Sequence, residues 1–283
     1  MVICVASGKG GTGKTTVAVN LALSLGNVQF LDLDVEEPNA YIFLKPKITH
    51  TKSVGVLVPQ IDEEKCSYCG KCADFCNYNA IAVVKGKVLF FPELCHNCGG
   101  CALVCPEGAI KEVTRPKGVI EEGIAAGSIH FIQGELIVGE AVSPPLIKAV
   151  KKAANTNQIT IIDVPPGTSC PAVESVKGSD FCILVTEPTP FGLNDLILAV
   201  EVVKKLKIPF GIVINRADVG DKKVDEYCER EKIPVLMRIP MDEEIAKAYS
   251  RGIPVIEVKP EYKENFIGLY KKVEQLKSTR MLL

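Results

Sequence analysis

The segment over residues 2–16, VICVASGKGGTGKTT, constrains the fold of this chain more than any other feature. Residues 8–15 match the pattern G-x-x-x-x-G-K-[ST], which forms a phosphate-binding loop only between a buried strand and the start of a helix. Here an apolar run over 2–6 precedes the loop, and a helical pattern over 14–25 follows it. The motif therefore predicts an α/β fold that binds ATP or GTP together with Mg²⁺.

Each position of the loop has a chemical role. Glycines let backbone N–H groups converge on phosphate oxygens, Lys14 reaches the β and γ phosphates, and Thr15 offers its hydroxyl to Mg²⁺. The expected nucleotide-binding residues of the loop are Gly8, Lys9, Gly10, Gly11, Thr12, Gly13, Lys14, Thr15 and Thr16.

Short apolar runs rich in Val and Ile alternate with segments of helical period along most of the chain. Strands are expected over 2–6, 28–34, 159–164, 181–186 and 210–215, and helices over about 14–25, 144–155, 191–206, 221–231 and 242–250. Runs that are apolar throughout indicate strands buried on both faces. This pattern predicts a doubly wound, mostly parallel sheet covered by helices.

Eight of the twelve cysteines fall within forty residues and repeat one spacing, C-x2-C-x2-C-x3-C, twice. In iron–sulfur proteins with this spacing, the fourth cysteine of each run ligates the other cluster. One 4Fe-4S cluster is expected on Cys66, Cys69, Cys72 and Cys105, and a second on Cys95, Cys98, Cys101 and Cys76. Zinc is the competing metal, although its sites usually pair two C-x2-C units over a longer loop.

The cysteine module resembles a bacterial two-cluster ferredoxin, a small α+β fold, with one departure at Asn77, where a proline often follows the fourth cysteine. It is expected over 61–113 as an insertion into the α/β domain, which takes 1–60 and 114–283. Gly70, Gly99 and Gly100 supply backbone freedom around the expected clusters.

The string KGGTGKT resembles the deviant phosphate loop of the superfamily that contains MinD, ParA, ArsA and the nitrogenase iron protein. That resemblance implies a homodimer formed on ATP binding, in which Lys9 crosses to the phosphates of the partner. A solvated loop lysine is the alternative for Lys9. The string DVPPGTS, which begins at Asp163, is similar to the switch II of Mrp-type iron–sulfur carrier ATPases and their MinD relatives.

The same resemblance assigns further residues. It puts the carboxylate that orients the attacking water at Asp34, so the expected catalytic residues are Lys9, Lys14 and Asp34. Asp163 is expected to hold Mg²⁺ together with Thr15, and Asn215 to read the adenine edge. Asp32 is expected to bond the phosphate loop. Helix caps are the alternative role for Asp34 and Asp163, and the Asp of N-R-A-D leaves GTP as the alternative nucleotide.

Charge and hydropathy exclude other classes. Thirty-three Lys and Arg against 34 Asp and Glu give a net charge of -1, so nucleic acid is not an expected partner. No leader or membrane-spanning run is recognisable, and we expect a cytoplasmic chain with reduced thiols. An apolar stripe after Glu261 predicts a terminal helix packed on the sheet, with membrane binding as the alternative. Cys170 is expected as a free thiol that begins a helix, with a ligand near a dimer axis as the alternative.

From these features the chain is identified as a member of the MinD superfamily with an inserted two-cluster ferredoxin. The expected function is an ATPase that dimerises on ATP and couples hydrolysis to electron transfer with a redox partner. The alternatives are an iron–sulfur assembly or carrier ATPase with a cluster-accepting partner, and a positioning ATPase that uses the ferredoxin for docking.

Overall fold

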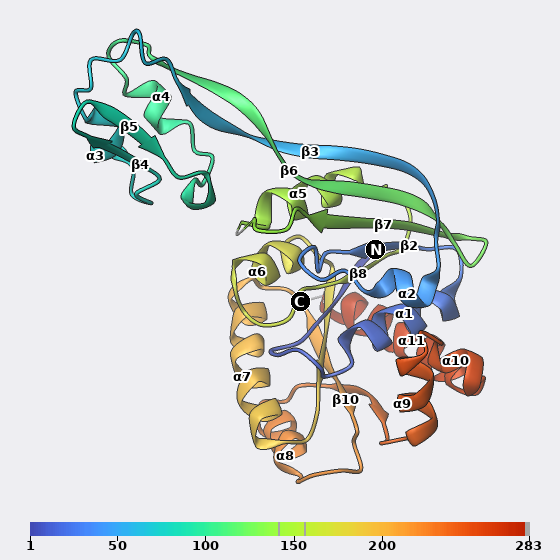
Figure 1. Cartoon of the computed structure of the whole chain (residues 1–283). Coiled ribbons are helices and arrows are strands. Elements are labelled where there is room, and N and C mark those ends of the chain that lie inside the picture. The colour runs from blue at the N-terminus through green and yellow to red at the C-terminus, as the bar shows by residue number, and fades with distance from the viewer. Residues whose placement is uncertain (141, 156, 281–283) are drawn as a thin grey trace. The chain divides into compact units, whose positions relative to one another are not determined.

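The computed structural model describes residues 1–140, 142–155 and 157–280, which divide into two compact units (Figure 1). The first unit contains Met1–Thr51, Ile120–Glu135 and Ile147–Leu283, and the second contains Lys52–Val119 and Leu136–Leu146. The predicted insertion over 61–113 lies inside the second unit, which takes in further residues on both sides. Two long strands, β3 (Lys47–Ile61) and β6 (Ile110–Ala125), run from one unit into the other.

A mixed sheet is the framework of the first unit. In the described residues its strand order is β11-β10-β9-β1-β8-β2-β7-β6-β3. The pairings from β11 to β7 are parallel, which confirms the expected mostly parallel sheet, although β7 and β11 were not among the predicted strands. These strands are β1 (Val2–Ala6), β2 (Gln29–Asp32), β7 (Ile129–Leu136), β8 (Thr160–Asp163), β9 (Phe181–Thr186), β10 (Phe210–Asn215) and β11 (Val235–Ile239).

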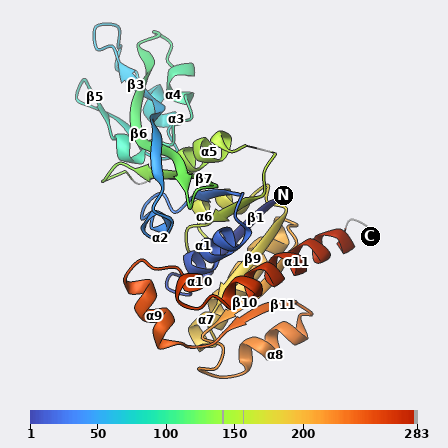
Figure 2. The ribbon, with the colours of Figure 1, turned by 90° about the vertical axis from the view of Figure 1, so that its right-hand side faces the viewer.

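Helices cover both faces of this sheet (Figures 1 and 2). One face carries α1 (Lys14–Leu25), α10 (Val255–Val258) and α11 (Tyr262–Arg280), with α2 (Ala40–Leu44) and α9 (Glu243–Ser250) nearby. The other carries α5 (Pro144–Ala153), α6 (Cys170–Val176), α7 (Pro190–Lys205) and α8 (Lys223–Arg230). Strand β1 lies between β8 and β9. The next strand in the chain, β2, lies on the β8 side of β1, whereas β9, β10 and β11 lie on the other side, so the strand order reverses at β1. Ligands of such sheets bind at the carboxyl ends of the strands, beside a reversal of this kind.

The terminal helix α11 confirms the prediction of a packed apolar stripe. Tyr262, Phe266, Leu269 and Val273 are buried in the core of the first unit, where α11 contacts α1 and β11. Within the described residues, no helix combines the length and the apolar character that crossing a membrane requires.

Strands β3 and β6 are antiparallel neighbours that sequence reasoning did not predict. A Cβ at Gly123 would lie 2.3 Å from the carbonyl oxygen of Lys47, and a Cβ at Gly55 would lie 3.0 Å from that of Arg115. The residue numbers of the two neighbouring pairs, 123 with 47 and 55 with 115, add up to the same number, as they do along a pair of antiparallel strands. At Gly123 the backbones lie too close for a side chain, and at Gly55 a Cβ would also lie 2.5 Å from Cγ2 of Thr114, so glycine suits the close approach at both places.

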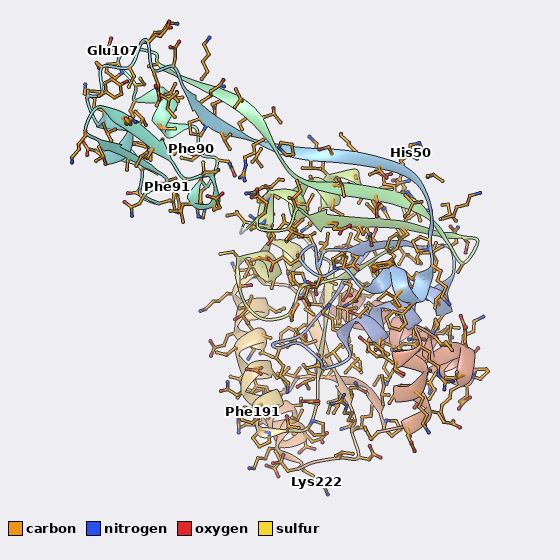
Figure 3. All side chains as sticks on the ribbon, in the orientation of Figure 1. His50, Phe90, Phe91, Glu107, Phe191 and Lys222 are labelled. Atoms are coloured by element: carbon orange, nitrogen blue, oxygen red, sulfur yellow. The ribbon has the colours of Figure 1, made fainter. Side chains whose placement is uncertain are left out.

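The second unit has a small core of its own around Val58, Ala80 and Cys95, against which Phe90 packs. Figure 3 labels Phe90, at the end of a hairpin formed by β4 (Ile81–Val84) and β5 (Lys87–Phe90). Its helical elements are α3 (Lys71–Phe75), η1 (Pro92–Leu94) and α4 (Gly100–Leu103).

Candidate functional site

The phosphate loop connects β1 to α1, as predicted. Gly11 and Gly13 have φ angles of 78° and 94°, a region that favours glycine. Added Cβ atoms would lie 2.1 Å from the carbonyl oxygen of Asp195 at Gly8, and 2.4 Å from Nδ2 of Asn215 at Gly13. The loop glycines therefore let α7 and the end of β10 approach the loop closely.

Four predicted residues meet at the end of this loop. Lys14 Nζ lies 2.7 Å from Asp163 Oδ1 and 3.7 Å from Asp34 Oδ2. The Thr15 hydroxyl donates to Asp163 Oδ2 at 2.7 Å. Lys14 and Thr15 begin α1, whereas Asp163 ends β8 and Asp34 follows β2. The parallel sheet thus brings together side chains that are up to about 150 residues apart in sequence.

Burial and mutual charge shift the pKa values in this cluster. Burial raises the pKa of Asp34 to about 6, although Lys14 opposes the change. Burial, together with the charge of Asp163 on the neighbouring strand, raises the pKa of Asp32 to about 7. Burial acts to lower the pKa of Lys14, but Asp163 and Asp34 outweigh it and raise that pKa. Lys14 is therefore the countercharge of a carboxylate-rich site.

Asp32 does not bond the phosphate loop, contrary to our expectation. Its Oδ1 accepts from the backbone N–H of Asp34 at 3.1 Å, and its Oδ2 accepts from those of Asn39 and Ala40 at 3.1 and 3.0 Å. The buried carboxylate thus satisfies N–H groups at the start of α2, which have no partner within the helix. It fixes the segment that follows Asp34.

A cavity of about 450 Å³ opens beside these groups, a size typical of small-ligand sites. Its lining includes the loop residues Gly10, Gly11, Gly13, Lys14, Thr15 and Thr16, together with Asp34 and Asn215. Two buried oxygens nearby have no hydrogen-bond partner, Thr12 Oγ1 in the loop and Oδ1 of Asn39, which lines the cavity. Unpaired polar atoms of this kind fit a site that binds a polar ligand.

Sequence reasoning missed part of this cavity. Pro240, Met241 and Asp242 line it after β11, and Tyr249 lines it from α9. Strand β11 was not among the predicted strands, so its carboxyl end was not considered. A short apolar run at Val235–Ile239 is the signal that could have located it.

Asn215 lines the cavity but also braces the loop, because its Nδ2 donates to the carbonyl oxygen of Thr12 at 2.9 Å. Its Oδ1 accepts from the backbone N–H of Arg216 at 3.0 Å. Asp218, the residue that kept GTP open, accepts from the backbone N–H of Met241 at 2.5 Å and so holds the cavity wall.

Lys9 is partly exposed and forms an ion pair with an acidic residue of its own chain. Its Nζ lies 2.5 Å from Oε1 of Glu187, whose Oε2 accepts from Arg216 at 2.9 Å. Glu187 follows β9 and is 8% exposed. Sequence reasoning predicted Lys9 but neither of these neighbours.

In the second unit, the eight module cysteines line two separate cavities. One is lined by Cys66, Cys69, Cys72 and Cys105, and the other by Cys76, Cys95, Cys98 and Cys101. Each cavity thus takes three cysteines from one run and the fourth from the other. Among the described residues, no three His, Cys, Asp or Glu side chains surround the position of a single metal ion.

The two halves of the module share backbone geometry with an offset of 29 residues. Tyr68 and Asn97 have positive φ angles of 55° and 58°, and Gly70 and Gly99 of 83° and 71°. In both halves the sulfur of the fourth cysteine accepts from a backbone N–H four residues later at 3.3 Å, from Ala80 to Cys76 and from Ala109 to Cys105. Because the backbone geometry repeats, Cys76 and Cys105 hold corresponding positions in the two halves, and each lines the cavity formed by the other three-cysteine run.

The halves differ in what covers each cavity. Tyr78 and His96 line the Cys95 cavity, and their rings stack with centroids 3.6 Å apart. The equivalent residues at the Cys66 cavity are Glu107, labelled in Figure 3, and Ser67.

Two thiols in these cavities, one in each, have raised pKa values. Burial raises the pKa of Cys101 to about 11, with a smaller contribution from nearby Cys95, and burial also raises the pKa of Cys72. Because a metal ligand must be a thiolate, binding there displaces protons.

Cys170 is exposed and is the first residue of α6, so it begins a helix as predicted. Cys4, Cys182 and Cys228 are buried.

Comparisons with known proteins agree with this geometry. The family model of the CobQ/CobB/MinD/ParA nucleotide binding domain matches residues 3–255. A Methanocaldococcus jannaschii protein of uncharacterized function is 31% identical over 97% of this chain and 97% of its own length. An iron–sulfur cluster carrier protein of Pyrococcus abyssi is 26% identical, covering 90% of this chain and 78% of its own.

Among solved structures, the septum site-determining protein MinD of Pyrococcus horikoshii in complex with Mg-ADP has the same fold. The match has a TM-score of 0.61 at 22% identity and covers 97% of this chain and 96% of that one. Since the family model spans most of the chain, including the phosphate loop and the Lys14–Asp163 cluster, the chain belongs to the CobQ/CobB/MinD/ParA family of nucleotide-binding domains.

Proposed function

We propose that this chain is an ATP-hydrolysing iron–sulfur protein in which the nucleotide state controls electron transfer to or from a redox partner. One observation carries the proposal. The residues that follow Asp34 continue through α2 into β3, and β3 enters the unit whose eight cysteines line two four-cysteine cavities. The nucleotide cavity and the unit with the two four-cysteine cavities are thus joined by one continuous stretch of chain.

The residues around the cavity of the first unit have distinct roles in the proposed hydrolysis of ATP. Lys14 contacts the β and γ phosphates, while Thr15 and Asp163 hold Mg²⁺ directly or through water. For this, Lys14 would exchange its contact with Asp163 for phosphate oxygens, and Asp163 would then be free to hold Mg²⁺. Asp34 lies 3.7 Å from Lys14, at the edge of the same cluster, and orients the attacking water.

The proposed active form is a two-fold dimer with two ATP molecules between the subunits. Lys9 of each subunit then contacts the phosphates bound by the other. Family membership supports this arrangement, as does the spare lysine in a loop where Lys14 already serves the nucleotide of its own subunit.

Each four-cysteine cavity is proposed to hold one 4Fe-4S cluster, on Cys66, Cys69, Cys72 and Cys105 and on Cys95, Cys98, Cys101 and Cys76. The donor set fits, because thiolates are the usual ligands of such clusters and each cavity offers four. A bound 4Fe-4S cluster exchanges single electrons. Cys72 and Cys101 contribute half-buried thiols that would release their protons on ligation.

Asp32 is the residue through which the two units are proposed to communicate. It binds the N–H groups of Asp34, Asn39 and Ala40 and so links the expected catalytic carboxylate to the start of α2. Movement of Asp34 toward a nucleotide would therefore be transmitted to α2 and on to β3.

Delivery of clusters to an acceptor protein is the second candidate function. It is favoured by relatives of which several are iron–sulfur cluster carrier proteins, among them those of Pyrococcus abyssi and Pyrococcus horikoshii at 26% identity. Resident electron-transfer sites are favoured by the four ligands that a single chain offers in each cavity.

One experiment separates the two functions. The anaerobically purified protein is incubated with ATP and Mg²⁺, either with a chelating acceptor or with a low-potential reductant. Electron transfer predicts that iron content stays constant while the oxidation state changes with turnover. Loss of iron that requires ATP hydrolysis would instead favour delivery. Protein without iron would contradict both candidates.

A further inference from the structure

Glu187 occupies a position between two cations of its own chain. Its Oε1 lies 2.5 Å from Lys9 Nζ, and its Oε2 accepts from Nη1 of Arg216 at 2.9 Å. The carboxylate side chain is 10% exposed, whereas those of Lys9 and Arg216 are 30% and 48% exposed. A nearly buried acid thus holds two partly exposed bases, one on each oxygen.

This arrangement determines what it costs to move Lys9. A buried carboxylate that loses its last cation is left uncompensated in a poorly solvated place, which is strongly unfavourable. Because Arg216 binds the other oxygen, Glu187 keeps a countercharge when Lys9 leaves. The second cation therefore lowers the cost of releasing the first.

Arg216 is held in place for this role. Its φ of 52° is unusual for a residue other than glycine, and its backbone N–H is bound by the side chain of Asn215. It directly follows β10 and lines the nucleotide cavity. Strained backbone of this kind persists where the surrounding structure maintains it, commonly at functional sites.

We propose that Glu187 and Arg216 are positioning residues that control the availability of Lys9. Glu187 holds Lys9 against its own subunit when no partner is present, and Arg216 pairs with Glu187 after Lys9 has moved to the phosphates of the partner. This inference rests on the proposed dimer and adds to it a regulatory contact. Glu187 opposes dimer formation, and Arg216 limits that opposition.

The proposal makes opposite predictions for the two residues. Glu187→Gln removes the charge that holds Lys9 and tightens the ATP-bound dimer. Arg216→Ala leaves Lys9 as the only countercharge of Glu187 among the described residues and weakens the dimer. In the double variant no buried charge needs a partner, so dimer affinity returns to that of Glu187→Gln.

Dimer affinity is measured by light scattering at saturating ATP and Mg²⁺ in a background that carries Asp34→Ala. We expect the dissociation constant to fall about tenfold with Glu187→Gln and to rise about tenfold with Arg216→Ala. Glu231→Gln is the matched control, because it makes the same chemical change at the exposed partner of Lys204, and it should have no effect. A fluorescent ATP analogue confirms that every variant is saturated.

A second readout does not depend on dimerisation. In the nucleotide-free protein, an amine-reactive reagent followed by mass spectrometry should modify Lys9 several-fold faster in Glu187→Gln than in the parent, with Lys204 as internal reference. An equal rate overturns the inference, as does a double variant that dimerises as weakly as Arg216→Ala. A parent that remains monomeric with ATP removes the proposed dimer itself, whereas a dimerising parent that Glu187→Gln leaves unchanged overturns this inference alone.

Discussion

Replacing Lys14 by Met should destabilise the nucleotide-free protein as well as prevent it from binding ATP. Lys14 lies 2.7 Å from Asp163, and their side chains are 8% and 0% exposed. Without the ammonium group, the Thr15 hydroxyl is the one remaining partner of the Asp163 carboxylate among the described residues. Breaking one side of a buried ion pair typically costs about 3–5 kcal/mol, because the remaining charge is uncompensated.

The assay is thermal unfolding of the first unit, followed by circular dichroism without nucleotide or divalent cations. For a domain of this size, a loss of about 3 kcal/mol lowers Tm by about 6–12 °C. Lys14→Met combined with Asp163→Asn removes both charges and should recover most of the loss. Lys9→Met is the control, because Glu187 retains Arg216, and its effect should stay below about 1 kcal/mol. A Lys14→Met protein as stable as the parent would refute this reasoning.

Three further predictions concern the core, the chemistry and the second unit. Phe266→Ala, at a fully buried site in α11, should cost about 3–5 kcal/mol in thermal unfolding, whereas Phe191→Ala, at a side chain 79% exposed (Figure 3), should change stability by less than about 0.5 kcal/mol. Asp34→Ala should still bind ATP in titration calorimetry while phosphate release falls about 100-fold or more, and unchanged release would remove this residue from the mechanism. Tyr78→Glu combined with His96→Ser copies the equivalent residues of the other half, and it should accelerate chelation of about half the iron; an unchanged time course would show that the stacked rings do not protect that cavity.

Much of the first unit could be predicted because its strands are apolar throughout. The runs over 2–6, 181–186 and 210–215 match β1, β9 and β10 at both ends. Strand β3 could not be found in this way, because its first seven residues are all exposed and it contains Pro59. It lies at the edge of the sheet, where a proline is tolerated and apolar alternation is not required.

In the candidate site, too, some residues could be predicted from the sequence and others could not. The phosphate-loop motif predicted the places of Lys14 and Thr15, and the family resemblance predicted that Asp163 would lie beside Thr15. The contact between Lys14 and Asp163 was not predicted. The partners of Lys9 and of Asp32 depend on which loops the sheet brings side by side. Neither Glu187 nor the N–H groups at the start of α2 has a sequence signal that identifies it as such a partner.

Coupling between the nucleotide site and the proposed iron–sulfur clusters is tested by comparing the cysteine module in three nucleotide states. Anaerobically purified Asp34→Ala protein is examined without nucleotide, with ADP and with ATP, each with Mg²⁺, by electron paramagnetic resonance, redox titration and the rate of iron chelation. We expect the purified protein to contain about eight iron atoms per chain. We also expect a potential or chelation rate that changes with ATP and less with ADP, since a ligand shifts an equilibrium only through differential affinity. Identical spectra, potentials and rates in all three states would contradict the proposed coupling between the two units.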